Sequence, residues 1–197
     1  NIMKSIAIDG PAGSGKSTIA KAIADRLKIT HLDTGAMYRV LALHAKENRV
    51  SRDDENKLGA LLSSLHFSLE NGQLLVNGLE LPSVIRDNEI GMLASKMSAI
   101  PMVRMAMQEK QRELAETYSL ILDGRDIGTY VLPNTPYKIY LDADIETRAK
   151  RRWEQHPDAE PYDKVLSDLI ERDRMDRERE IAPLKVADDA YVLDNTD

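Results

Sequence analysis

The stretch that decides the fold runs from residue 10 to residue 17 and reads GPAGSGKS. It follows residues 5–9, a short apolar and β-branched run typical of a buried strand. It precedes residues 17–27, whose apolar side chains repeat at helical spacing. Gly13 and Gly15 can adopt positive φ, so the backbone N–H groups and the helix N-terminus can approach phosphate oxygens closely. This strand–loop–helix context identifies a phosphate-binding loop, or P-loop.

The side chains of the loop predict a nucleoside triphosphate as its ligand. Lys16 is placed to reach the β- and γ-phosphates, and the Ser17 hydroxyl is placed to ligate Mg²⁺. A GTPase would also need a guanine-reading Asn-Lys-x-Asp motif, which the single Asn-Lys pair at residues 56–57 does not provide. The motif alone leaves a switch, a motor or a small-molecule kinase open. The residues expected to bind ATP are Gly10, Pro11, Ala12, Gly13, Ser14, Gly15, Lys16, Ser17 and Thr18.

Outward from the loop, short apolar strands alternate with helices. Further strands are predicted at residues 30–33, 120–123, 137–141 and 191–194. Helices are predicted at residues 36–47 (capped by Thr34), 53–65, 85–99, 101–117, 144–155 and 163–180. Residues 66–83 alternate instead and contain two Asn-Gly pairs, which are strong hairpin signals. The pattern predicts an α/β fold, in which a five-stranded parallel sheet is flanked by helices and carries a small antiparallel β insertion. Such folds usually add one more helix after the fifth strand, and the sequence stops before it.

Composition excludes several classes of protein. The 197 residues contain no Cys, which rules out a disulfide scaffold and a Cys nucleophile. With 27 basic and 33 acidic side chains the net charge is -6, which argues against a nucleic-acid binder. No run of 18 apolar residues and no signal peptide is present, so we expect a cytoplasmic protein without a membrane partner. Met3 looks like the native start.

A second anion site is predicted around residues 123–126, which read DGRD. Three apolar residues precede Asp123, so it lies at the carboxyl end of a buried strand, where a Mg²⁺-supporting carboxylate belongs. Gly124 and Gly128 predict a tight turn that presents Arg125 and Asp126 to the crevice beyond the sheet. The alternative is a polar loop with internal salt bridges.

Three further groups of charged side chains are candidates for the same crevice. Tyr38 and Arg39 follow the second strand, although each alone could be an ordinary helix-surface residue. The charged run 171–179 is either a solvated helix with ion pairs or a mobile lid whose arginines close over the transferring phosphoryl group. Within this run, side chains at i, i+4 and i+7 share one face of the helix, namely Arg172, Asp176 and Arg179. On the preceding helix, Arg148 and Arg152 share a face in the same way. The four histidines show no ligand spacing and are interpreted as structural or surface residues.

In this order the motifs resemble those of the bacterial cytidylate kinases, a family of nucleoside monophosphate kinases among the P-loop NTPases. The resemblance covers nearly the whole chain and is carried by residues 8–17, 32–39, 123–129, 172–179 and 181–184. It implies ATP + CMP (or dCMP) ⇌ ADP + CDP (or dCDP), with Mg²⁺ and ATP as co-substrate. A kinase for another nucleoside monophosphate and a P-loop regulatory protein remain the alternatives.

The resemblance also implies roles for individual residues. The catalytic residues are expected to be Lys16, Arg125, Arg148 and Arg152. Ser17 is expected to ligate Mg²⁺, with Asp123 as an outer-sphere partner. The CMP-binding residues are expected to be Thr34, Tyr38, Arg39, Ser95, Arg104, Arg125, Asp126, Arg172, Asp176 and Arg179. A carboxylate among arginines suits cytosine, which offers an amino donor beside acceptors, and leaves uracil mismatched.

The expected organisation is a single kinase domain over residues 1–197 that acts as a monomer on small nucleotides. It divides into a core, a monophosphate-binding lobe with the β insertion and a lid. Their expected bounds are 3–35, 101–147 and 182–197 for the core, about 36–100 for the lobe and about 148–181 for the lid.

Overall fold

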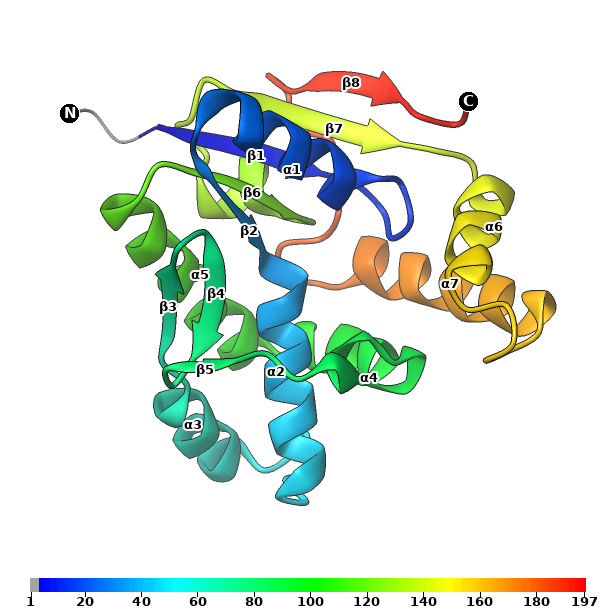
Figure 1. Ribbon diagram of the computed structural model, residues 1–197. Coiled ribbons are helices and arrows are strands. Elements are labelled where there is room, and N and C mark those ends of the chain that lie inside the picture. The colour runs from blue at the N-terminus through cyan, green and yellow to red at the C-terminus, as the bar shows by residue number, and fades with distance from the viewer. Residues whose placement is uncertain (1–3) are drawn as a thin grey trace.

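The computed structural model describes residues 4–197, so the expectation about Met3 lies outside the described residues. Five parallel strands form the central sheet (Figure 1). Their spatial order is β2 (Thr30–Asp33), β6 (Leu120–Gly124), β1 (Ser5–Asp9), β7 (Lys138–Asp142) and β8 (Tyr191–Asp194). The fold class predicted from the sequence is therefore confirmed. Because β1 lies between β6 and β7, the crevice beyond its carboxyl end is where such a sheet binds ligands.

The two faces of the sheet are buried by different helices. Along β1, Ile6 and Ile8 pack against the apolar side of α1 (Lys16–Leu27), which covers one face (Figure 1). Ala7 points to the opposite face and joins the main core with α2 (Thr34–Glu47) and α5 (Pro101–Thr117). The alternation of side chains along a strand explains this division.

The β insertion is a separate antiparallel sheet below the central one. It contains β3 (Phe67–Glu70), β4 (Gln73–Val76) and β5 (Leu79–Glu80), in that order. Both Asn-Gly pairs adopt positive φ at both positions, between 50° and 78°, which is the conformation that two-residue hairpin turns need. The predicted insertion is confirmed. Along the chain, α3 (Glu55–Ser64) precedes the insertion, and the 3₁₀ turn η1 (Ser83–Arg86) and α4 (Asn88–Ser98) follow it.

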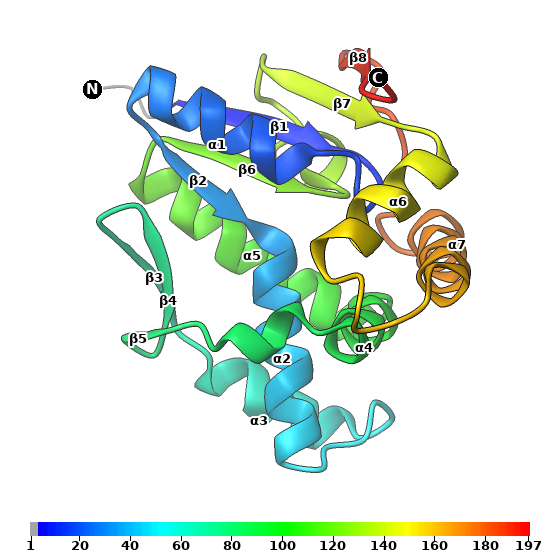
Figure 2. The same ribbon diagram turned by 45° about the vertical axis from the view of Figure 1, so that its right-hand side comes forward.

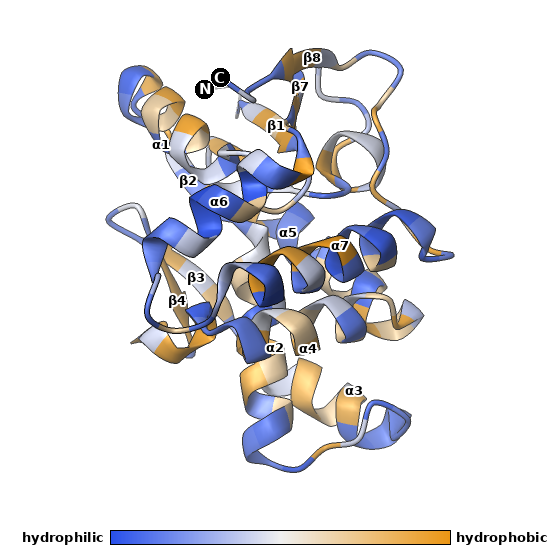
Figure 3. Ribbon diagram, turned by 90° about the vertical axis from the view of Figure 1, so that its right-hand side faces the viewer, coloured by the Kyte–Doolittle hydropathy of each residue, from blue (hydrophilic) through white to orange (hydrophobic). Residues whose placement is uncertain are grey.

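Two helices close the side of the molecule opposite the insertion. They are α6 (Ile145–Gln155) and α7 (Tyr162–Glu178), which pack against each other (Figure 2). Most of α6 is coloured hydrophilic in Figure 3. The short turn η2 (Ile127–Val131) lies in the segment that joins β6 to β7.

Four local predictions need correction. The cap of α2 is Asp33, whose carboxylate accepts from Ala36 N at 3.3 Å, because the Thr34 hydroxyl instead donates to Asp123 O at 2.7 Å. The helix predicted at residues 85–99 is η1 followed by α4, because the extended backbone of Asp87 interrupts it. The helix predicted from residue 53 begins at Glu55, after the Asp54 cap. The tight turn predicted after residue 124 is the wider turn η2.

Glycine is required where β1 meets the loop. A Cβ on Gly10 would lie 2.0 Å from Leu141 O of the neighbouring strand β7, which is far inside van der Waals contact. Within residues 4–197, no helix is long and apolar enough to cross a membrane.

Candidate active site

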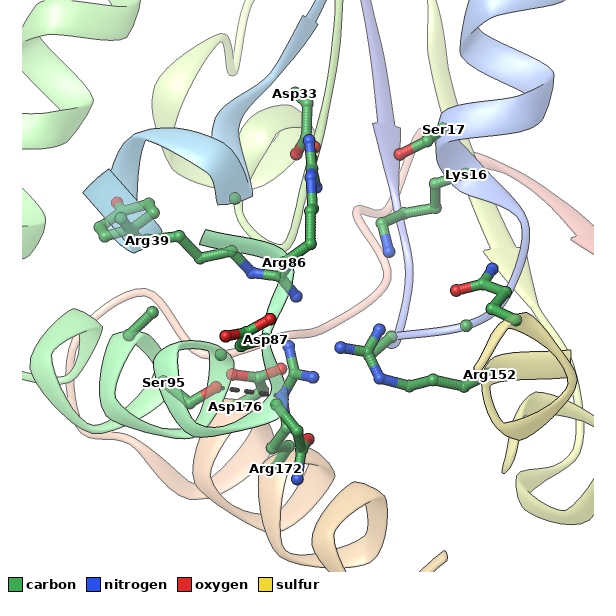
Figure 4. Close-up of a pocket in the computed structure, with 18 of the residues that line it drawn as sticks. Lys16, Ser17, Asp33, Arg39, Arg86, Asp87, Ser95, Arg152, Arg172 and Asp176 are labelled. Carbon is green, nitrogen blue, oxygen red and sulfur yellow. Dashed lines mark hydrogen bonds and ion pairs between the residues drawn. The ribbon is translucent and has the colours of Figure 1, made fainter. Parts of the chain in front are cut away.

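One large cleft lies beyond the carboxyl ends of the strands and has a volume of about 1300 Å³. The P-loop, the ends of β2 and β6, and α2, η1, α4, α5, α6 and α7 all contribute residues to its wall. Side chains from several of these elements point into one space (Figure 4). Lys16 enters from the P-loop, Arg39 from α2 and Arg152 from α6. The cleft therefore combines a phosphate-binding loop with cationic side chains that face it.

The P-loop has the geometry that its sequence predicts. Gly13 and Gly15 have φ of 76° and 95°, which other residues rarely adopt. Lys16 opens α1, is 6% exposed, and donates from Nζ to Pro11 O at 3.0 Å. Burial, and then the positive charge of Arg125, lower the pKa of the Lys16 amine to about 7. The amine is thus poised to gain its full charge when an anion arrives.

Two oxygen atoms that could ligate or support Mg²⁺ lie close together at the start of α1. Ser17 Oγ lies 3.4 Å from Asp123 Oδ2, at the end of β6. His31 also contacts this carboxylate. Burial, followed by the charge of Asp33, raises the pKa of Asp123. Within residues 4–197 no three His, Cys, Asp or Glu side chains form a metal cage. A hydroxyl and a carboxylate fit Mg²⁺, which takes most of its other ligands from water and substrate phosphates.

The opposite side of the cleft is crowded with guanidinium groups: Arg39, Arg86, Arg125, Arg152 and Arg172. Burial and the nearby Arg152 lower the pKa of Arg39 to about 10. Burial, and then the repulsion from Arg152 and Arg39, also lower the pKa of Arg172. These groups repel one another without an anion between them. Arg is the side chain best suited to bind phosphate in a bidentate manner, so the cluster fits a phosphorylated acceptor.

The predicted shared face of α7 is confirmed, since Arg172, Asp176 and Arg179 all line the cleft. Asp176 accepts from Arg125 Nε at 3.0 Å, and Arg179 Nη1 lies 3.6 Å from it. Despite its burial, the pKa of the Asp176 carboxyl is lowered, chiefly by Arg125 and Arg179. Arg172 also donates to Ser95 Oγ of α4 at 3.3 Å (Figure 4).

At the inner end of the cleft, Arg104 lies over Tyr38. The guanidinium carbon is 4.4 Å from the ring centroid, and Nη1 donates to the Tyr38 hydroxyl at 2.7 Å. The same Nη1 lies 3.3 Å from Asp126 Oδ2. Asp126 is 1% exposed and is placed behind Arg104 rather than on the cleft wall. Gln108 donates from Nε2 to the same carboxylate oxygen at 2.9 Å.

The structure does not bring every predicted residue to the cleft. Those outside its wall are Gly10, Pro11, Ser14, Asp126 and Arg148. The guanidinium of Arg148 donates to Ala143 O and Ala12 O and binds Asp173 through both terminal nitrogens, at 3.0 and 2.6 Å. In this arrangement Arg148 ties α6 to α7 and to the P-loop, and its catalytic role stays a prediction.

Sequence reasoning missed Arg86 and its partner. Arg86 Nη1 donates to Asp33 Oδ2 at 3.0 Å, and both residues line the cleft. Arg86 lies in η1 outside every motif, and 53 residues separate it from Asp33. The sequence could have predicted that Asp33 lies at the cleft, because it ends β2 and parallel strands end at the ligand-binding edge of the sheet.

A P-loop that faces an arginine-rich pocket across one cleft defines a P-loop kinase whose acceptor carries a phosphate. Residues 6–197 match the family model described as cytidylate kinase. A cytidylate kinase of Thermosipho melanesiensis is 46% identical over 97% of this chain and 88% of the relative. That of a Geobacillus species is also 46% identical, with the same coverage. The chain belongs to the cytidylate kinase family and is a nucleoside monophosphate kinase. In fold it also resembles an uncharacterized protein from Eubacterium ventriosum, with a TM-score of 0.51 and 14% identity over all of this chain and 92% of that one.

Proposed function

We propose that this enzyme transfers a phosphoryl group reversibly between ATP and CMP or dCMP. The observation that carries the proposal is the position of Lys16 and the arginine cluster on opposite sides of one cleft. The P-loop would hold the triphosphate, and Arg39 and Arg125 would hold the phosphate of the acceptor. The two phosphates would then meet between Lys16 and Arg152, as in-line transfer requires.

Positioning and charge neutralisation account for catalysis in this proposal. The acceptor phosphate oxygen is already anionic, so no strong general base is needed to activate it. Lys16, Arg125, Arg152 and, as predicted, Arg148 would offset the charge that spreads over the migrating group. Uptake of one proton from solvent would convert the Lys16 amine to an ammonium, which would stay charged while the phosphates are bound.

Mg²⁺ would be held by the Ser17 hydroxyl, with Asp123 as its outer-sphere partner. When bound, the ion would supply positive charge that offsets the negative charge of the phosphates. The contacts between Ser17, Asp123 and His31 support this assignment, because they fix the hydroxyl and the carboxylate at the mouth of the P-loop.

The base of the acceptor would lie at the inner end of the cleft. Ser95, Arg104, Asp126 and Arg179 would read cytosine, and Thr34 and Tyr38 would shape the site around the nucleotide. Arg172 and Asp176 would contact the sugar. The position of Asp126 behind Arg104 means that the guanidinium forms the part of this reader nearest the cleft.

Residues 36–100 would act as the monophosphate-binding lobe and residues 148–181 as the lid. The remaining segments, 3–35, 101–147 and 182–197, would form the core. We expect a cytoplasmic monomer that acts on free nucleotides, and the net charge of -6 supports the absence of a nucleic-acid partner.

A coupled assay of ADP release tests the proposal directly. Mg-ATP is offered with CMP, dCMP, UMP, AMP, GMP or no acceptor. Turnover restricted to CMP and dCMP is the expected result. Turnover with another monophosphate would keep the kinase and refute the cytosine site, whereas release of ADP without any gain from an acceptor would refute the kinase.

A further inference from the structure

A row of polar side chains on α5 backs the inner end of the cleft. Arg104, Gln108 and Gln111 occupy positions i, i+4 and i+7 and so share one face of the helix. They are 2%, 8% and 0% exposed. The same helix contributes Val103 and Met107 to the main hydrophobic core. A buried amide in such surroundings costs free energy unless it is hydrogen-bonded, so the partner of Gln108 is informative.

That partner is the carboxylate expected to read the base. Gln108 Nε2 donates to Asp126 Oδ2 at 2.9 Å, and Arg104 Nη1 lies 3.3 Å from the same oxygen. The opposite orientation of the amide would set its carbonyl oxygen against a carboxylate oxygen, and both are acceptors. Two donors therefore meet one oxygen of Asp126 and fix the plane of its carboxylate.

We propose that Gln108 is a positioning residue that sets the base specificity of the acceptor site by acting through Asp126 and Arg104. The inference rests on the proposed function. Cytosine complements the arrangement, because its ring acceptors suit the donor-only guanidinium of Arg104 and its amino group suits the carboxylate. Uracil offers an N–H where the guanidinium also donates, and a carbonyl where the carboxylate also accepts. Each mismatch leaves a buried polar group unpaired.

The test measures CMP and UMP binding by isothermal titration calorimetry for the wild type, Gln108→Met and Gln108→Glu. Removing a hydrogen bond to a charged group should weaken CMP binding by about tenfold, with a smaller effect on UMP. In Gln108→Glu a second carboxylate lies beside Asp126, so the two share a proton. The protonated group can donate to a uracil carbonyl, and the CMP/UMP affinity ratio should fall further. KM for CMP should rise in both variants, whereas kcat and KM for ATP should stay near the wild-type values.

Lys110→Met is the control, because it removes a part-buried polar side chain from the same helix that donates to Leu65 O at 3.1 Å and does not line the cleft. It should keep the wild-type CMP/UMP ratio. Gln108→Glu preserves the size of the side chain, so it still tests the proposal if Gln108→Met does not fold. The proposal is overturned if the wild type binds both nucleotides equally, if the Gln108 variants keep its ratio, or if Lys110→Met changes the ratio as much.

The binding ratio and ADP release separate this inference from the proposed function. A changed ratio without any ADP release would support Gln108 and refute the kinase. Normal ADP release from CMP with an unchanged ratio would refute the role of Gln108 alone.

Discussion

Lys16 has its pKa lowered to about 7, first by burial and then by repulsion from Arg125. At pH 8 most molecules without nucleotide therefore hold this amine uncharged. The phosphates of ATP favour the ammonium form and raise the pKa again. Binding must then draw a proton from solution, and the uptake should approach one proton per ATP at pH 8 and vanish toward pH 6.

Calorimetric titration with ATP in two buffers of different ionisation enthalpy measures this uptake. Lys16→Arg is the control, because its guanidinium stays charged across the whole range and should bind ATP without proton uptake. Equal uptake by the variant and the wild type would assign the proton to another group.

Single residues differ in how far the sequence predicts them. Lys16 and Ser17 follow from a continuous motif. For Arg172 and Asp176, helical spacing predicts only a shared face, and the family resemblance is what implies that this face binds the acceptor. Arg86, His31 and Gln108 could not be predicted, because their roles depend on carboxylates that are distant in sequence. His31 and its partner Asp123 are 92 residues apart in the sequence, and the pairing of β2 with β6 brings them together.

At the scale of elements, the attachment of α6 to α7 depends on a buried ion pair. Arg148 and Asp173 have side chains only 5% and 14% exposed. Removing one partner leaves the other charge buried and unpaired, which typically costs about 3 kcal/mol or more. We expect Asp173→Ala to lower the free energy of unfolding by about that amount, as measured by urea denaturation.

Glu171→Ala is the control on the same helix. Its pair with Arg174 is exposed at both ends, 44% and 54%, and exposed pairs contribute about 1 kcal/mol or less. If both variants lost the same small amount of stability, the pair of Arg148 with Asp173 would not be needed for folding. The predicted catalytic role of Arg148 would then gain support.

The strands of the central sheet were predicted to within one residue, because each is a short apolar run between polar turns, although β8 is exposed at every position. Helix starts were less predictable, since they depend on which side chain accepts the free N–H groups. Asp33 rather than Thr34 caps α2 because Thr34 bonds to the end of β6, a partner 89 residues away. The same limit applies to α4, where the extended backbone of Asp87 replaces a helical turn.

At the scale of the whole molecule, the alternation of strands and helices was sufficient to predict the parallel sheet, and the two Asn-Gly pairs were sufficient to predict the insertion. The arrangement of the cleft was not predictable in the same way, because α2, α4, α6 and α7 meet there only in three dimensions. Repulsion among the arginines of these helices suggests how the molecule responds to ligands. Two bound nucleotides would replace that repulsion by attraction from every side.

We expect ATP and CMP together to draw α6 and α7 toward the acceptor lobe. Small-angle scattering should record a smaller radius of gyration with both nucleotides than with neither. Trp153 offers a second measurement, because it is the single Trp of the sequence and lines the cleft. Its fluorescence should change more with both nucleotides than with ATP alone. An unchanged radius and an unchanged spectrum would contradict the closing motion.

Because guanidinium groups crowd the cleft, the anion of the buffer should affect the measured affinity for CMP. Phosphate and sulfate have the shape and charge of the group that the cluster is built to hold, so both should compete with CMP. The KM for CMP should be higher in phosphate than in a buffer with a bulky organic anion at the same ionic strength, with kcat unchanged. Inside a cell, where inorganic phosphate is abundant, the vacant acceptor site of this enzyme would rarely be free of an oxyanion.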